Sequence, residues 1–148
     1  MKSPDGRECS TFRRHKRIAL SGKKTTTLYF LNATERLVEQ IEVDGCAITA
    51  GKRCDWLIRL NDDVSKEEIY VELKGSKVYD AVEQLQATMR QLSANRTQFS
   101  KRCLVVIARS PMTGTDVQKY KVQFQRLFNS HFDLVRNNTE ILLSNASR

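Results

Sequence analysis

Two short runs of alternating polarity constrain the fold of this chain more than any other feature. Residues 54–60 read Cys-Asp-Trp-Leu-Ile-Arg-Leu, and residues 69–74 read Ile-Tyr-Val-Glu-Leu-Lys. Because successive side chains of a β-strand point to opposite faces, the second run puts Glu72 and Lys74 on one face, and pairing of the runs can bring Asp55 beside them. Two carboxylates and one ammonium group would then share one patch of sheet. Such oxygen ligands suit a hard divalent cation, beside a lysine that can touch a water molecule or a phosphate.

A helix is expected before the first of these runs. Residues 27–31 predict a short strand. Asn32, followed three residues later by Glu35, is a capping signature that predicts a helix through about Val43. A further short strand is expected around residues 46–49.

Two amphipathic helices dominate the second half of the chain. Apolar residues recur at helical spacing from Val78 to Leu92 and again from Val117 to Phe128. The other expected segments are a hairpin-like loop at 61–66, a strand buried on both faces at 103–108, and a last strand or hairpin formed by 132–135 and 140–143. The predicted order is helix, strand, strand, helix, strand, helix, strand, which describes an α/β domain with a mixed central sheet flanked by helices.

The charge of the chain points to a polyanionic partner. The 148 residues carry a formal net charge of +8, with a sequence pI near 9.5. Basic residues crowd the first 25 positions, so residues 1–25 are expected to be a flexible basic arm and residues 26–148 a single domain. The plain alternative is a solvated basic surface. The arm residues expected to contact nucleic acid are Arg13, Arg14, Lys16, Arg17, Lys23 and Lys24.

The cysteines and the hydropathy pattern bear on the compartment. Cys9, Cys46, Cys54 and Cys103 are widely spaced without a C-x-x-C pair, so they are expected to be reduced, mostly buried thiols rather than zinc ligands. No apolar run has the length of a membrane span, and the charged N-terminus lacks the apolar core of a signal peptide. A cytoplasmic protein with no membrane partner is therefore expected.

The arrangement of these motifs resembles the PD-(D/E)xK nuclease superfamily, which has the restriction-endonuclease-like fold. The resemblance is carried by an Asp on one strand, here Asp55, by Glu-x-Lys on the next, here Glu72 and Lys74, and by the helix and buried strand that follow. It covers residues 32–108. Cys54 stands where the family name has a proline.

Within that superfamily, residues 32–77 are most similar to Holliday-junction resolvases and related small endonucleases. In those proteins a helix with a Glu-Arg pair precedes the Asp strand, as Glu35-Arg36 does here. The resemblance makes Glu35 the predicted fourth acidic residue of the catalytic site. Glu39, one helical turn later, is its competitor, because both residues lie off the apolar stripe of the expected helix.

The resemblance also implies a Mg²⁺-dependent phosphodiesterase in which Mn²⁺ can substitute. Asp55 and Glu72 would hold the metal through their carboxylates and Leu73 through its main-chain carbonyl. Lys74 would orient or help deprotonate the attacking water, or stabilise the charge of the transition state. Arginine would be a poor substitute for it, since its guanidinium does not lose a proton.

The expected function is that of an endonuclease on DNA, structure-specific and paired with a second copy or a partner protein, because one site cuts only one strand. Two alternatives stay open. The first is a non-catalytic nucleic-acid-binding subunit of a repair or defence assembly that uses the same fold. The second is a nuclease directed at RNA.

Overall fold

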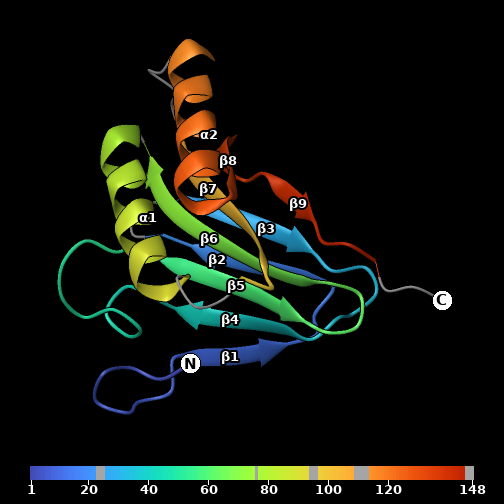
Figure 1. Ribbon diagram of the computed structural model, residues 1–148. Helices are drawn as coiled ribbons and strands as arrows, with labels where there is room; N and C mark the ends of the chain where they lie inside the picture. Colours follow the sequence, from blue (N-terminus) through green and yellow to red (C-terminus); the bar gives the residue numbers. More distant parts are fainter. Residues whose placement is uncertain (23–25, 76, 94–96, 109–113, 146–148) are drawn as a thin grey trace.

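The computed structural model describes residues 1–22, 26–75, 77–93, 97–108 and 114–145 and has a mixed α/β architecture (Figure 1). In chain order its elements are β1 (Ser10–Arg13), β2 (Arg17–Ser21), β3 (Thr27–Leu31), β4 (Val38–Glu42), β5 (Trp56–Asn61), β6 (Lys66–Gly75), α1 (Val78–Leu92), β7 (Ser100–Ile107), α2 (Gly114–Phe128), β8 (Ser130–Arg136) and β9 (Glu140–Leu142).

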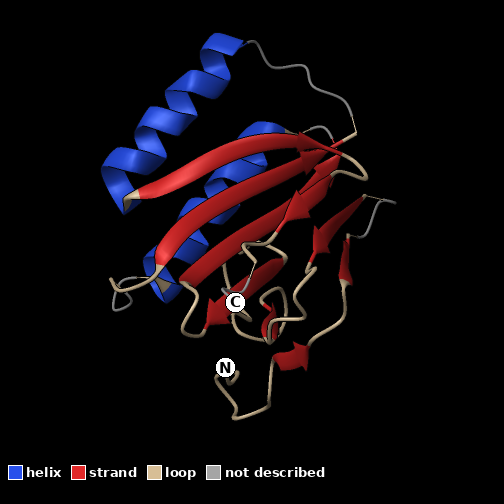
Figure 2. Ribbon diagram, turned by 90° about the vertical axis from the view of Figure 1, so that its right-hand side faces the viewer, coloured by secondary structure: helices blue, strands red, loops and turns tan. Residues whose placement is uncertain are grey.

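The main sheet has the strand order β1-β4-β5-β6-β7-β8. Its first four strands pair antiparallel, whereas β6, β7 and β8 run parallel, joined by crossovers through α1 and α2. Both helices cover one face of this sheet, and a small sheet of order β2-β3-β9 covers the other face (Figure 2). The protein is therefore layered as helices, main sheet and small sheet.

Each face of the main sheet has its own hydrophobic core. Leu57 and Tyr70 belong to the core under the helices, whereas Ile58 and Val71 belong to the core between the two sheets. The alternation predicted for residues 54–60 and 69–74 is thus confirmed for residues 56–60 and 69–73, whereas Cys54 lies in the same core as Leu57 and the register of β6 shifts at Lys74. The structure adds that both faces of β5 and β6 are buried, because the small sheet supplies a third layer.

The helices predicted from Val78 and from Val117 and the buried strand predicted at 103–108 are confirmed as α1, α2 and β7. The loop at 61–66 is confirmed as a hairpin connection, with Asn61 paired to Lys66. The last two strands do not form a hairpin, since β8 pairs with β7 and β9 pairs with β3. Residues 46–49 form no strand; Asp44 and Ile48 make only an isolated bridge.

The helix predicted from Asn32 to Val43 is wrong, and β4 takes its place. The Asn32 side chain does not cap a helix. Its Oδ1 accepts the N–H of Arg36 at 3.0 Å, and its Nδ2 donates to the carbonyl of Arg36 at 2.9 Å, which closes a turn. After that turn the β-branched Val38 and Ile41 are fully buried in a strand that pairs with β5.

The described part of the expected flexible arm, residues 1–22, is folded. β1 pairs with β4 at the edge of the main sheet, and β2 pairs with β3 in the small sheet. Ile18 and Leu20 are buried between the sheets, which explains why a segment rich in charge can nevertheless be ordered. Lys23 and Lys24 lie outside the described residues.

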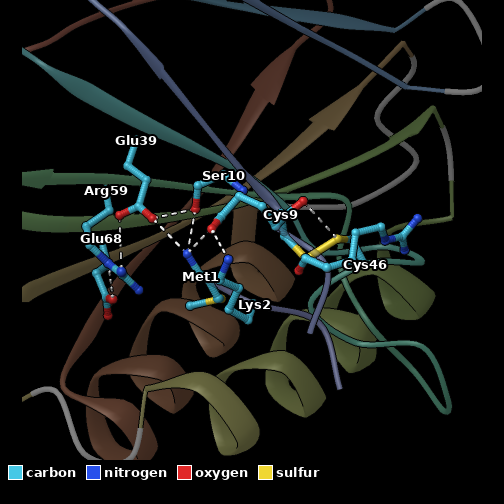
Figure 3. Close-up of polar contacts among 10 residues, drawn as sticks. Met1, Lys2, Cys9, Ser10, Glu39, Cys46, Arg59 and Glu68 are labelled. Atoms are coloured by element: carbon cyan, nitrogen blue, oxygen red, sulfur yellow. Dashed lines mark hydrogen bonds and ion pairs between the residues drawn. A yellow bond between two sulfur atoms is a disulfide. The ribbon is translucent and has the colours of Figure 1, made fainter. Parts of the chain in front are cut away.

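Cys9 and Cys46 form a disulfide, so the prediction of a free thiol is wrong for this pair (Figure 3). The two are 37 residues apart in sequence, but the pairing of β1 with β4 brings them together. Cys54 and Cys103 are free and buried, as expected. Disulfides are typical of oxidising compartments, so this feature does not support a cytoplasmic location. Of the helices described, none is long and apolar enough to cross a membrane.

Candidate functional site

Asp55, directly before β5, and Glu72, on β6, are neighbours at one end of the main sheet. The register pairs Trp56 with Val71, and the N–H of Asp55 donates to the carbonyl of Val71 at 3.2 Å. Asp55 therefore lies opposite Glu72. Its Oδ2 also accepts the N–H of Leu73 at 2.9 Å, which fixes the carboxylate against β6. The predicted meeting of the two carboxylates is confirmed.

Lys74 completes the group at an irregularity of β6. The pairing of β6 with β7 shifts register between Leu73 and Gly75, so Lys74 is the extra residue of a β-bulge. A bulge turns a side chain away from the direction that regular alternation would give it and is common beside active sites. The Lys74 Nζ lies 3.6 Å from Glu72 Oε2.

The carboxyl of Glu72 is in an unfavourable position for a negative charge. Glu72 is 3% exposed, and its Oε1 has no hydrogen-bond partner among the described residues. Burial, together with the nearby Asp55 carboxylate, raises the pKa of Glu72 to about 8, although Lys74 opposes this shift. Burial also raises the pKa of Asp55, against the hydrogen bond from Leu73. Two crowded carboxyls of this kind retain a proton near neutral pH unless a cation joins them.

The group fits a divalent cation in its chemistry. The donors would be the two carboxylates and, as the family resemblance implies, the main-chain carbonyl of Leu73, all of them the hard oxygen ligands that Mg²⁺ prefers. A cation beside Glu72 Oε1 would satisfy this buried acceptor, which has no hydrogen-bond partner among the described residues. Within the described ranges no three His, Cys, Asp or Glu side chains form a metal-binding group, so water would supply the remaining ligands.

Asp44 is an acidic neighbour of Asp55 that the sequence analysis did not predict. Its main-chain N–H donates to the carbonyl of Asp55, and its carboxylate adds to the rise in the pKa of Asp55, after the larger effect of burial. Arg53 Nε donates to Asp44 Oδ1 at 2.8 Å and partly neutralises it. A cavity of about 270 Å³ opens beside Asp44 and Asp55, with Ser21 and Gly22 among its lining residues. The only sequence signal was the Asp-Gly turn at 44–45.

The structure does not bring Glu35 to this site, and that prediction is wrong. Glu35 is exposed in the turn before β4, with a φ of 51°. Because Val38 pairs with Leu60, the turn lies beyond the far end of β5. The loss of the expected helix therefore removes Glu35 from the site.

Glu39, the competitor, is also remote from Asp55. It pairs with Arg59, four residues along β5 from Asp55, which is about 13 Å at the rise of a strand. Figure 3 shows Arg59 between Glu39 and Glu68, with distances of 3.2 Å to each carboxylate. Tyr70 also donates to Glu68 at 3.0 Å. These residues form a separate, largely buried charge network under the helices.

The four described arm residues that were predicted to contact nucleic acid lie on β1, in the turn after it and at the start of β2. Arg13 lies on β1 and donates to Gln40 Oε1 at 2.8 Å. Arg14 and Lys16 are exposed in the turn between β1 and β2, and Arg17 begins β2 on the outer face of the small sheet. Their contact with nucleic acid stays a prediction.

Comparison with known proteins gives no relative. No protein-family model, no curated protein and no solved structure matches this chain.

Proposed function

We propose that Asp55, Glu72 and Lys74 form the active site of a metal-dependent endonuclease that hydrolyses DNA phosphodiester bonds. The observation that carries this proposal is the buried Glu72 Oε1, which has no hydrogen-bond partner among the described residues and lies in a carboxylate pair beside a bulged lysine. The resemblance of the Asp and Glu-x-Lys motifs to the PD-(D/E)xK nucleases agrees with it. The finer expectation, a restriction-endonuclease-like core with junction or flap specificity, is part of the same proposal.

Each residue has a distinct role in this mechanism. Asp55, Glu72 and the Leu73 carbonyl would hold Mg²⁺ or Mn²⁺. An ion bound there would supply positive charge at the phosphate oxygens and would lower the pKa of the attacking water. Lys74 orients that water and stabilises the charge that develops on the phosphate. The water oxygen loses a proton to solvent as it bonds to phosphorus, the bond to the leaving sugar oxygen breaks, and that oxygen takes up a proton from solvent.

One observation favours a non-catalytic nucleic-acid-binding subunit as the second candidate. Lys74 already forms an ion pair with Glu72 at 3.6 Å, and Arg53 already forms one with Asp44. Charges that neutralise one another in this way can serve stability alone. A subunit of this kind would bind nucleic acid without responding to a divalent cation.

A cleavage panel separates the two candidates. The substrates are supercoiled plasmid, linear duplex, single strand, flap, four-way junction and RNA, each with Mg²⁺, with Mn²⁺ or with EDTA. Lys74→Ala is compared with Lys77→Ala, an exposed lysine three residues further on that gives the same change in charge. Metal-dependent products that disappear in Lys74→Ala and persist in Lys77→Ala support the nuclease. Intact binding without products, in a protein whose melting temperature does not respond to Mg²⁺, supports the binding subunit.

A further inference from the structure

The outer face of the small sheet is open and carries an arginine that stacks on a tyrosine. Neither of the two described helices covers this face, since both lie on the far side of the main sheet (Figure 2). Ile18, Leu20 and Phe30 point inward to the core between the sheets, so the alternate residues of β2 and β3 face outward. The outer face includes Arg17, Ala19, Ser21, Tyr29, Glu140 and Leu142.

Tyr29 and Arg17 form a stacked pair on this face, with Tyr29 on the central strand and Arg17 at the start of β2. The Arg17 guanidinium lies over the Tyr29 ring, 3.8 Å from its centroid. Tyr29 is partly buried on the central strand of the small sheet, and its neighbours in register are Ala19 on β2 and Glu140 on β9. The Arg17 side chain is 57% exposed and also pairs with Glu140 at 3.5 Å, so its guanidinium can be reached from solvent.

The charge around this pair suits a nucleic acid backbone. Arg14 and Lys16 are exposed in the turn that leads directly into Arg17, so three cations lie at one end of the face. A cationic surface with a stacked aromatic ring and guanidinium is what single strands bind, because unpaired bases stack on such planes while the phosphates meet the cations. The bases of a duplex stay stacked inside it, so they cannot stack on Tyr29, and the ring does not strengthen duplex binding.

The other end of the same face leads to the candidate active site. Ser21 follows Ala19 by two residues, about 7 Å along the strand. The Ser21 carbonyl accepts the Nε1–H of Trp56 at 3.2 Å, and Ser21 and Gly22 line the cavity that contains Asp55. A strand bound over Tyr29 would thus pass Ser21 before it reaches Asp55.

We propose that the outer face of the small sheet, centred on the stacked Arg17–Tyr29 pair, binds single-stranded nucleic acid and feeds it over the sheet edge at Ser21 and Gly22 toward the Asp55–Glu72 site. The feeding step rests on the proposed nuclease function and narrows its substrate to DNA with a single-stranded part. The binding step stands on the geometry of the small sheet alone.

Binding is measured separately from cleavage, by fluorescence anisotropy in EDTA with a labelled oligothymidylate of about 15 nucleotides. Tyr29→Leu keeps an apolar side chain but removes the ring, and Tyr29→Phe keeps the ring. Arg17→Ala is matched by Arg90→Ala, which removes the same charge from another guanidinium that faces an aromatic ring, that of Phe128, on the helical side of the protein.

The proposal expects Tyr29→Leu and Arg17→Ala each to weaken oligothymidylate binding by about tenfold. Tyr29→Phe should bind like the wild type, and Arg90→Ala should change binding by no more than about twofold. Unlabelled single strand should displace the probe at lower concentration than blunt duplex. Thermal melts of all four variants show whether each one folds. If Tyr29→Leu does not fold, the binding of Arg17→Ala and Tyr29→Phe still tests the proposal.

Equal effects of Arg17→Ala and Arg90→Ala, with wild-type binding by Tyr29→Leu, would overturn the proposal, as would equal displacement by duplex. The same variants distinguish its failure from that of the nuclease. Cleavage that depends on Lys74 but not on Tyr29 or Arg17 refutes the small-sheet surface and leaves the nuclease standing. Binding that depends on Tyr29 and Arg17, in a protein that cleaves no substrate, refutes the nuclease and leaves the small-sheet surface standing.

Discussion

Replacement of Glu72 by glutamine should make the metal-free protein more stable at alkaline pH. Folding raises the pKa of Glu72 from an ordinary value of 4.5 to about 8, first through burial and then through Asp55. The folded protein therefore binds this proton more tightly than the unfolded chain. Stability contributed by the protonated carboxyl is complete below pH 4.5 and falls as the pH rises toward 8.

The size of the effect follows from the same shift. At about 1.4 kcal/mol for each tenfold change in proton affinity, full ionisation of Glu72 costs the folded state roughly 3–5 kcal/mol, part of which is shared with Asp55. Glu72→Gln cannot ionise and avoids this cost. The variant and the wild type should differ little in the free energy of unfolding at pH 4 and by a few kcal/mol at pH 9.

The assay is urea denaturation in EDTA across this pH range. Glu35→Gln is the control, because it makes the same change at an exposed residue beyond the far end of β5. Addition of Mg²⁺ at ten times its dissociation constant should stabilise the wild type by about 1.4 kcal/mol and leave Glu72→Gln almost unaffected. Parallel pH profiles for Glu72→Gln and the wild type would refute the view that Glu72 carries a destabilising buried charge.

Two further predictions test the surroundings of the site. A Cβ at Gly22 would lie 2.7 Å from the Cβ of Leu73, so Gly22→Ala should lower the free energy of unfolding by about 2 kcal/mol and reduce cleavage. At Gly114 a Cβ meets nothing within 4 Å, so in urea denaturation Gly114→Ala should stay within about 0.5 kcal/mol of the wild type. Reduction of the Cys9–Cys46 disulfide, which spans 37 residues, should lower the free energy of unfolding by about 2–4 kcal/mol. Alkylation of the unreduced, denatured protein should label only Cys54 and Cys103, and labelling of all four cysteines would contradict the pairing.

The features that the sequence predicted well are those decided by periodicity. The alternation around Asp55 and Glu72 and the helical spacing from Val78 to Leu92 each depend on which residues must face a core, and tertiary packing agrees with these patterns. The pairing of β5 with β6 could be predicted because a short polar loop joins them. For this reason local patterns in the sequence suffice to predict that Asp55, Glu72 and Lys74 lie together.

The features that could not be predicted depend on contacts between distant residues. Asn32 and Glu35 have the spacing of a helix cap, yet the Asn32 amide closes a turn instead. That turn commits the following residues to pair with β5, and a local pattern carries no sign of this choice. Asp44 and the partner of Cys9 were missed for the same reason, since each is defined by how the loop after β4 folds back onto other strands.

The parallel pairing of β3 with β9 has a consequence for how this protein is made. β3 ends at Leu31, whereas β9 begins at Glu140, so the small sheet joins segments that leave the ribosome more than a hundred residues apart. Until β9 emerges, the apolar side of β2 and β3 lacks Ile141 and Leu143 of the core that it shares with the main sheet. A nascent chain therefore exposes apolar surface for most of its synthesis, which makes it a candidate for chaperone binding, and closure of this layer is a late event in folding.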